Sequence, residues 1–327
     1  MNNNVKPWAV VLAGGSGNRL SSLTRAADGG APIPKQYCSL VGGATLLEDA
    51  LVRAQRLTSS AHTVTIVASE HSVWWRPQLA TLPNGNVLVQ PRNRGTAIGI
   101  LLTALHIYQR APTSTLVFLP SDHFIRDENI IDECLLKGVD YLDSDPDSLL
   151  IIGITPDDVD PELGYIVPGK HNSTGIFGVN RFIEKPDRVA AQALLAAGSV
   201  WNSFIFAVRA RTLLQMFVRS APMTLDAMHR ALTRDDWSTA EGHALGELYE
   251  SLGDSDFSRH ILEGNEAMLR VLPAPRCGWT DLGTPQRVGK CVAQLGARHL
   301  TRAVPRASLA TSFINLAAAH SRLSLAD

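Results

Sequence analysis

Short apolar runs rich in β-branched residues alternate with longer segments of helical periodicity, and this alternation constrains the fold more than any other feature. Strands are expected at 8–13, 64–68, 87–90, 116–119 and 149–154, and helices at 46–57, 96–110 and 129–142. Strands that alternate with helices build a mostly parallel sheet covered on both faces. The uninterrupted apolar runs 10–12 and 149–152 fit strands buried on both sides.

The pattern changes after about residue 155 and indicates a more mixed sheet. Further strands are expected at 165–167, 176–183, 204–208 and 268–272, and helices at 188–197, 212–220, 225–232 and 240–252. No Pro/Gly/Ser-rich linker or internal repeat divides the chain. We therefore expect one domain over residues 1–295 and a C-terminal helical tail over 296–327. The amphipathic stretch 309–325 in that tail reads as a packed helix or a dimer contact, so a homodimer is a possible assembly.

Composition and charge exclude several classes of function. The chain has 327 residues with 45% hydrophobic content, which suits a globular protein with a large core. A net charge of −1 gives no broad surface for nucleic acid or an anionic membrane, so phosphate binding has to be local. No segment approaches the ~18 apolar residues of a membrane span, and the N-terminus lacks the pattern of a secretory signal.

The four cysteines are widely spaced and form no CxxC pair. This spacing argues against a zinc site and against a disulfide framework, and favours a reducing compartment. The expected location is cytoplasmic.

A glycine-rich loop follows the first expected strand, which ends at Ala13. Glycines at 14, 15 and 17 allow backbone N–H groups to approach an anion closely, and Arg19 and Lys35 supply cations for phosphate. The loop is neither a P-loop nor a dinucleotide fingerprint, because Leu20 stands where the last glycine is needed. Taken alone, the loop could also be a structural turn.

Seven short blocks, in order, resemble the sugar-phosphate nucleotidyltransferases (nucleotide-sugar pyrophosphorylases), and among them most closely the mannose-1-phosphate guanylyltransferases. The blocks are GGSGNRL at 14–20 with PKQY at 34–37, PRNRGTA at 91–97, SDH at 121–123, ELGY at 162–165, FIEKP at 182–186, WN at 201–202 and GWTDLG at 278–283. The resemblance spans roughly residues 8–290. It implies a Rossmann-like (GT-A-type) α/β fold of three layers around a mixed, mostly parallel sheet.

The resemblance also implies a set of site residues and a reaction. It assigns nucleotide binding to Ala13, Gly14, Gly15, Gly17, Arg19, Asn93, Gly95 and Thr96, and sugar-phosphate binding to Gly164, Tyr165, Glu184, Lys185 and Asn202. Arg19, Lys35 and Asp122 would be catalytic, and Asp122 and Asp281 would hold Mg²⁺. The expected reaction transfers GMP from GTP to α-D-mannose 1-phosphate and releases pyrophosphate.

Each of these residues also has a structural interpretation when its motif is read by itself. Asp122 could cap a helix, and so could Thr96. Asp281 and Asn202 could stabilise turns through their own side chains. The Glu184–Lys185 pair could lie on a solvated edge, and His123 more often makes a structural hydrogen bond than carries chemistry.

The chain departs from the family pattern mainly around the expected sugar pocket. Ser21 and Ser22 replace a tryptophan and a proline, residues 24–33 lengthen the loop before Lys35, and Phe204 stands where glycine is more frequent. The turn at Gly164 also lacks the repeated Gly-Tyr. These changes leave the sugar and the nucleotide open, with glucose or heptose 1-phosphate and other nucleoside triphosphates as alternatives. A catalytically weak protein that binds nucleotide sugars is a further alternative.

Overall fold

A computed structural model describes residues 6–25, 31–171, 173–234 and 243–299. Within these ranges, nine strands form one sheet in the order β3-β2-β1-β4-β8-β5-β9-β7-β6. The strands are β1 (Trp8–Ala13), β2 (Thr63–Ala68), β3 (Val87–Gln90), β4 (Thr115–Pro120), β5 (Leu149–Ile154), β6 (Tyr165–His171), β7 (Phe177–Ile183), β8 (Val200–Arg209) and β9 (Leu269–Ala274).

The pairings make the sheet mixed and mostly parallel, as the sequence predicts. Strand β1 pairs in parallel with β2 and β4, β2 with β3, and β5 with β9. Strands β7 and β8 run against their neighbours, so they oppose the direction of the other strands in the described sheet. β8 therefore joins a parallel unit, β1–β4, to a second unit built on β5 and β9.

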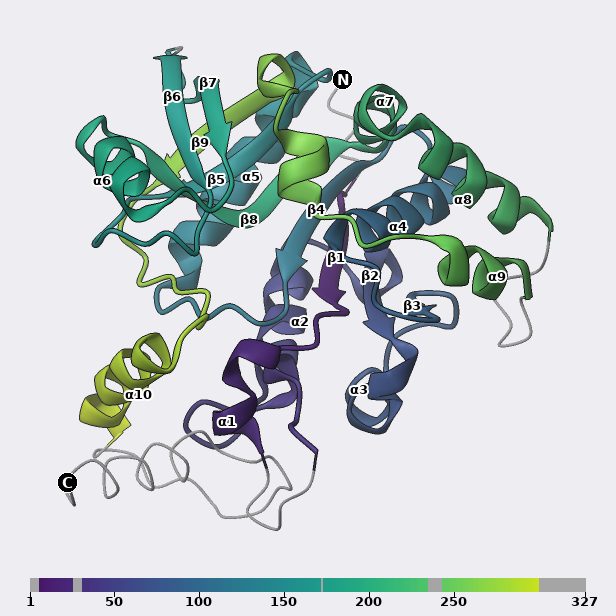
Figure 1. Cartoon of the computed structure of the whole chain (residues 1–327), viewed down its shortest axis with the longest axis horizontal. Helices are drawn as coiled ribbons and strands as arrows, with labels where there is room; N and C mark the ends of the chain where they lie inside the picture. Colours follow the sequence, from purple (N-terminus) through teal and green to yellow (C-terminus); the bar gives the residue numbers. More distant parts are fainter. Residues whose placement is uncertain (1–5, 26–30, 172, 235–242, 300–327) are drawn as a thin grey trace.

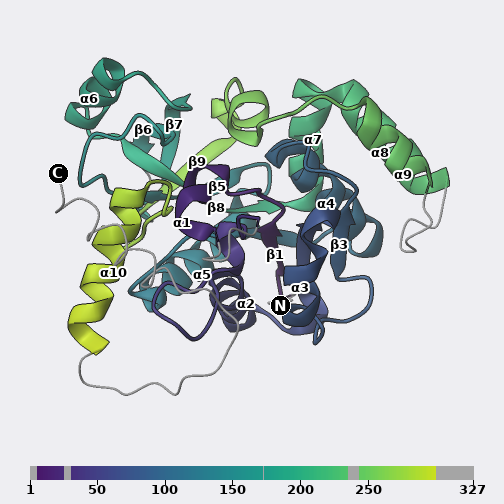
Figure 2. The same ribbon diagram turned by 60° about the horizontal axis from the view of Figure 1, so that its bottom comes forward.

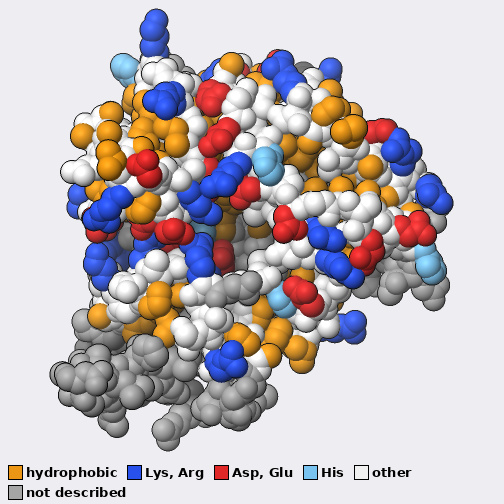
Figure 3. Space-filling view, viewed as in Figure 1, with side chains coloured by type: hydrophobic (Ala, Val, Ile, Leu, Met, Phe, Trp, Pro, Cys, Tyr) orange, Lys and Arg blue, Asp and Glu red, His pale blue; other side chains and the backbone are white. Residues whose placement is uncertain are grey.

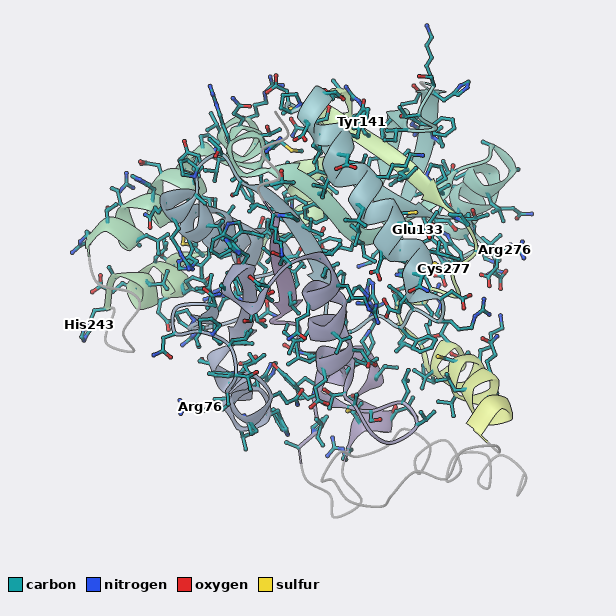
Figure 4. The ribbon with its side chains drawn as sticks, turned by 180° about the vertical axis from the view of Figure 1, so that it is seen from behind. Arg76, Glu133, Tyr141, His243, Arg276 and Cys277 are labelled. Carbon is teal, nitrogen blue, oxygen red and sulfur yellow. The ribbon has the colours of Figure 1, made fainter. Side chains whose placement is uncertain are left out.

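Helices cover both faces of the sheet (Figures 1 and 2). On one face lie α4 (Thr96–Arg110), α7 (Ala210–Ser220), α8 (Pro222–Arg234) and α9 (His243–Ser251); on the other lie α2 (Leu46–Leu57) and α5 (Glu128–Ser144). Successive residues of β1 face opposite layers. Val10 packs in the core that includes α4 and α7, and Val11 packs in the core that includes α2 and α5. Seen from behind, α5 crosses the sheet with Glu133 and Tyr141 on it (Figure 4). The three-layer expectation is confirmed.

Four further α-helices lie in the described ranges, and three of them were not expected from sequence; one of the three is a single turn over Ser21–Thr24. These helices are α1 (Ser21–Thr24), α3 (Ser72–Gln78), α6 (Arg188–Ala196) and α10 (Pro285–His299). α3 was missed because it is short and contains Pro77, and α10 runs across the expected boundary at residue 295. The predicted helix at 309–325 lies outside the described residues.

The four cysteines are buried thiols without disulfide bonds, as their spacing predicts. No helix in the described ranges has the length and apolar content needed to cross a membrane.

A buried ion pair joins the two helices on the α2/α5 face. Arg53 of α2 is 1% exposed and binds Glu128 of α5 through two hydrogen bonds, Nε–Oε2 at 2.8 Å and Nη2–Oε1 at 2.7 Å. Removing Glu128 takes away the hydrogen-bonded carboxylate of a buried guanidinium and leaves only the more weakly placed charges of Asp49 and Asp132 near it.

We expect Glu128→Gln to lower the free energy of unfolding by about 3 kcal/mol, because Arg53 stays buried without its carboxylate. Urea unfolding followed by circular dichroism measures this loss. Arg230→Ala is the matched control, since Arg230 pairs with Asp226 on the exposed surface of α8, and it should cost at most about 0.5 kcal/mol. Equal losses in both variants would contradict the assignment.

Candidate active site

A large cavity of about 1090 Å³ opens where β1, β3 and β4 end. Figure 3 shows a hollow in the middle of this face, bordered by acidic and basic side chains. Ligands in open α/β sheets bind at this edge, where loops leave the carboxyl ends of the strands. The lining includes Gly14, Gly15, Arg19, Asn93, Gly95, Thr96, Asp122, Gly164, Glu184, Lys185, Asn202 and Asp281. The structure thus gathers most of the predicted site residues in one place, and Gly17 and Lys35 line a smaller adjoining cavity.

The glycine loop is held by two side chains that the sequence analysis did not assign to the site. Gln36 Nε2 donates to the carbonyl oxygens of Ala13 at 3.1 Å and Gly15 at 2.7 Å, and Tyr37 Oη donates to Ala13 at 3.2 Å. In a trans peptide the next N–H points away from the carbonyl, so the N–H groups of Gly14 and Ser16 face away from these donors. Both residues line the cavity, and their N–H groups are suited to bind an anion.

Two of the loop glycines suit their surroundings, one by the space it leaves and one by its backbone conformation. A Cβ on Gly14 would lie 2.6 Å from Gln90 Nε2, and Gly17 has a φ of +63°. Arg19 lines the cavity with its Nη1 3.1 Å from Glu162 Oε2, and both side chains are about half exposed. The conformation of the loop therefore depends on the close packing at Gly14 and on the positive φ of Gly17, while the guanidinium of Arg19 stays accessible to solvent.

Lys35 connects the two predicted metal ligands. Its Nζ lies 3.0 Å from Asp122 Oδ2 and donates to the backbone oxygen of Asp281 at 2.6 Å. Burial by itself would raise the pKa of Asp122, but the charge and hydrogen bond of Lys35, with smaller contributions from neighbouring groups, hold that pKa below its usual value. Asp122 does not cap a helix, since α5 begins after Asp127.

Asp281 is held as a carboxylate by a residue that sequence reasoning missed. Its Oδ1 accepts hydrogen bonds from Arg287 and from the N–H of Gly283, so the turn interpretation of Asp281 is also correct. Burial would raise the pKa of Asp281, but the charge of Arg287, together with Lys35 and the N–H of Gly283, lowers that pKa below its usual value. Arg287 also binds Asp160 and lies 5.8 Å from the ring centre of Trp201.

His123 is a structural neighbour of these groups. Its ring lies edge-on to Trp279 at 5.3 Å, and burial lowers its pKa to about 4. A neutral imidazole carries no charge to an anion at neutral pH. Among the residues that the structure describes, no cluster of three or more His, Cys, Asp or Glu side chains could hold a metal ion.

The residues assigned to the sugar phosphate lie together at another part of the cavity. Glu184 is buried rather than on a solvated edge, with its side chain 9% exposed and its Oε1 3.8 Å from Lys185 Nζ. A Cβ on Gly164 would lie 2.6 Å from Glu184 Oε2 and 3.3 Å from Asn202 Cβ, so these three residues are in close contact. Asn202 Nδ2 donates to Ser258 Oγ at 3.3 Å.

Asn202 also forms the turn that its sequence allows, because its Oδ1 accepts from the N–H of Phe204 at 2.9 Å. Tyr165, in contrast, does not line the cavity. Its side chain is fully buried in the core, and its Oη accepts from the N–H of Asp160 at 3.0 Å. Ala13 is buried as well and contributes its carbonyl oxygen to the loop contacts described above.

The start of α4 is crossed by a later segment of the chain. Ala97 N–H donates to Ser255 O at 3.0 Å, Ser255 N–H to Arg94 O at 3.0 Å, and Phe257 N–H to Thr96 Oγ1 at 2.8 Å. The side chain of Thr96 therefore accepts a hydrogen bond from this later segment and does not cap α4. Gly95, with a φ of +83°, is needed because a Cβ would lie 2.3 Å from Ser255 O.

The same segment supplies cavity residues that the sequence analysis did not identify. Asp254, Ser255, Asp256, Ser258, Arg259 and His260 all line the cavity. In the amino-acid sequence this segment resembles an ordinary polar loop, and no local motif identifies it as part of the site. Its acidic residues also affect Glu184, since burial and then the charge of Asp256 raise the pKa of Glu184 to about 7.

We expect Gly95→Ala to lower the free energy of unfolding by more than about 2 kcal/mol, because the new Cβ would collide with Ser255 O in addition to straining the backbone. Gly198→Ala is the control, since Gly198 has a similar φ of +78° but open space around its Cβ. It should lose only about 1 kcal/mol, the cost of the backbone strain. Urea denaturation compares the two, and an equal loss would argue against close packing at Gly95.

The raised pKa of Glu184 predicts a pH-dependent stability. Because its carboxyl ionises near pH 7 in the folded protein and near 4.5 in the unfolded chain, it stabilises the fold below pH 4.5, and this contribution is lost as pH rises to 7. Relative to Glu184→Gln, the wild type should therefore lose about 2–3 kcal/mol of unfolding free energy between pH 4.5 and 8. Urea titrations across this range measure the difference, and parallel curves for both proteins would refute it.

Comparison with known proteins agrees with this architecture. Residues 8–296 match the family model described as nucleotidyl transferase. The chain is 28% identical over 290 residues to mannose-1-phosphate guanylyltransferase 2 of Escherichia coli O157:H7, covering 85% of this chain and 58% of the relative. It is 32% identical over 284 residues to the xanthan biosynthesis protein XanB of Xanthomonas campestris pv. campestris strain B100, covering 84% and 57%. The chain thus spans somewhat more than half the length of these curated relatives.

A solved structure from Thermus thermophilus, described as mannose-1-phosphate geranyltransferase, is 28% identical with a TM-score of 0.72, covering 85% of this chain and 77% of that one. A UDP-glucose pyrophosphorylase complexed with UDP-glucose, at 11% identity and a TM-score of 0.56, shares the fold. The family match covers most of the chain, including the glycine loop and both aspartates. The chain belongs to the nucleotidyl transferase family.

Proposed function

We propose that this protein is a mannose-1-phosphate guanylyltransferase, which transfers GMP from GTP to α-D-mannose 1-phosphate and releases pyrophosphate. One observation carries the proposal: the glycine loop, the Lys35–Asp122–Asp281 group and the Glu184–Asn202 group border adjoining cavities at one edge of the sheet. The guanylyltransferase name of the Escherichia coli relative supports the choice of substrates.

The glycine loop and Arg19 are proposed to bind the triphosphate, with Asn93, Gly95 and Thr96 near the base. A loop of backbone N–H groups with a flexible guanidinium suits a polyphosphate. Lys185, Glu184, Asn202 and the backbone at Gly164 are proposed to bind the sugar phosphate. Lys185 is 40% exposed, and its charge can pair with a phosphate.

The charge of the cavity supports a requirement for a divalent cation. Its described lining contains seven carboxylates (Glu70, Asp122, Glu162, Glu184, Asp254, Asp256 and Asp281) but four basic side chains (Arg19, Arg92, Lys185 and Arg259). Lys35 and Arg287, which lie outside this lining, neutralise Asp122 and Asp281. The protein charges therefore nearly balance, and the phosphates of two substrates would add negative charge that a divalent cation can neutralise. Asp122 and Asp281 fit Mg²⁺ because they are hard oxygen ligands on one cavity, and phosphate oxygens can complete the coordination. Bound there, Mg²⁺ would supply charge neutralisation and orientation of the phosphates.

In the proposed reaction an oxygen of the sugar phosphate attacks the α-phosphorus of GTP, and the bond to the pyrophosphate breaks. The attacking phosphate is already ionised, so no general base and no covalent enzyme intermediate are needed. The protein aligns two anions and stabilises the charge that moves to the leaving group. Arg19 and the loop hold the triphosphate, and Lys35 acts near the transferred phosphoryl group through its position beside Asp122.

Two alternatives to this function are considered. The changed residues around the sugar pocket allow glucose or heptose 1-phosphate, or another nucleoside triphosphate, as the substrate. A catalytically weak protein that binds nucleotide sugars is the alternative outside enzymes. It is disfavoured because Arg19, Lys35, Asp122, Lys185 and Asp281 all lie on the two adjoining cavities, and a binding protein has no need of a complete catalytic charge set.

Pyrophosphate release from each of four nucleoside triphosphates, combined with mannose, glucose and heptose 1-phosphates in the presence of Mg²⁺, tests the proposal. We expect the highest kcat/KM for GTP with mannose 1-phosphate. Tight binding of GDP-mannose without pyrophosphate release would favour the binding protein, and preference for another pair would replace the proposed substrates.

We expect Asp122→Asn to reduce turnover on the order of a hundredfold, because an amide cannot neutralise or orient a cation at this position. Pyrophosphate release measures the rate, and circular dichroism checks that the variant is folded. Asp226→Asn on exposed α8 is the matched control and should leave turnover unchanged. Full activity of Asp122→Asn would remove Asp122 from the metal role.

A further inference from the structure

Phe204 has an unusual backbone for its residue type. Its φ of +58° lies in the left-handed region, which a bulky side chain adopts only with strain. Among the described residues of the cavity lining, Lys185 is the other non-glycine residue with a positive φ, at 48°. A glycine at this position would adopt such a φ without strain.

A bulge in β8 produces this conformation. Ile151 of β5 pairs with Phe206, whereas Gly153, two residues on, pairs with Asn202, four residues back along β8. The two extra residues disrupt the ladder and redirect the side chains near them. The pairing between β4 and β8 ends at the same place, with Phe118 opposite Phe206.

Side-chain hydrogen bonds hold the bulge. Ser203 Oγ donates to Ile152 O at 2.6 Å and accepts from the N–H of Ile205 at 3.0 Å, while the N–H of Phe204 donates to Asn202 Oδ1 at 2.9 Å. Ser203 and Ile205 are fully buried. The strained residue is therefore fixed from both sides, and it does not belong to a loose loop.

The bulge places the ring of Phe204 between the core and the cavity. The ring lies edge-on to Phe206 at 5.9 Å and to Phe257 at 6.1 Å, and the residue is only partly buried. Phe204 lines the cavity together with Asn202, Glu184 and Gly164. An aromatic ring thus forms an apolar wall next to the polar groups that are proposed to hold the sugar.

We propose that Phe204 determines sugar selectivity: its ring packs against the hexose of the sugar 1-phosphate and excludes sugars with a bulky substituent, such as an acetamido group. This inference rests on the proposed function. Pyranose rings have apolar C–H faces that suit an aromatic wall, and the polar groups around Asn202 suit their hydroxyls. A ring held rigidly by the bulge and by two further aromatic rings cannot move aside for a larger ligand.

The test compares the wild type with Phe204→Ala, Phe204→Gly and Phe204→Leu. For each protein, kcat/KM is measured with GTP and Mg²⁺ for mannose 1-phosphate and for N-acetylglucosamine 1-phosphate. Binding of both sugar phosphates without nucleotide is measured by saturation-transfer NMR. We expect the preference for mannose 1-phosphate to fall at least about tenfold in the alanine and glycine variants, and to stay within about threefold in the leucine variant, which retains bulk. The KM for GTP should not follow this pattern.

Thermal melting distinguishes the effect of backbone strain at Phe204 from the effect of losing its aromatic ring. Because glycine tolerates a φ of +58° and alanine does not, Phe204→Gly should melt at a higher temperature than Phe204→Ala, although both lose the ring and should lose selectivity alike.

An unchanged preference in both small variants, in an enzyme that turns over mannose 1-phosphate, would overturn the role of Phe204 and leave the proposed function standing. A wild type that neither bound nor turned over any sugar phosphate would overturn both.

Discussion

The ammonium group of Lys35 holds together three parts of the chain, and the site depends on it. The lysine follows the glycine loop of β1, while its partners lie after β4 and in the loop after β9. The side chain of Lys35 is 7% exposed, so these contacts form where water screens them weakly. One cation thereby fixes the distance between a carboxylate and a backbone oxygen that are far apart in sequence, and places both at the edge of the cavity.

The charges around this lysine form a balanced set. Arg287 neutralises Asp281 from the side of α10, and Lys35 neutralises Asp122 from the side of the loop. The pKa values of both carboxyls are therefore lowered, although Asp281 is buried and Asp122 is only about one third exposed. Around Glu184, burial and the charge of Asp256 raise the pKa of its carboxyl more than Lys185 and Arg259 lower it. The cavity thus has a part where carboxylates are kept charged and a part where a carboxylate can be neutral, a difference that suits cations in one place and hydroxyl groups in the other.

Much of the fold and part of the site follow from local patterns. The boundaries of β1, β5, α2 and α4 agree with those expected, because strands buried on both faces are continuously apolar and covering helices keep their 3.6-residue period. The α3 helix was not expected, since Pro77 and its short length weaken the signal. The full length of β8 was also missed, because its bulge breaks the alternation of side chains at Phe204.

The sequence by itself determined the succession of strands and helices, the glycine loop and the family, since all three are expressed in short contiguous patterns. Only the tertiary structure decided that Arg287 binds Asp281, that the segment around Ser255 crosses α4, that Tyr165 is buried away from the cavity, and that Phe204 faces it. The physical reason is that these relations depend on contacts between distant segments, and local propensity carries no information about which distant groups will meet. Backbone strain and pKa shifts have the same origin, because packing from several elements imposes both.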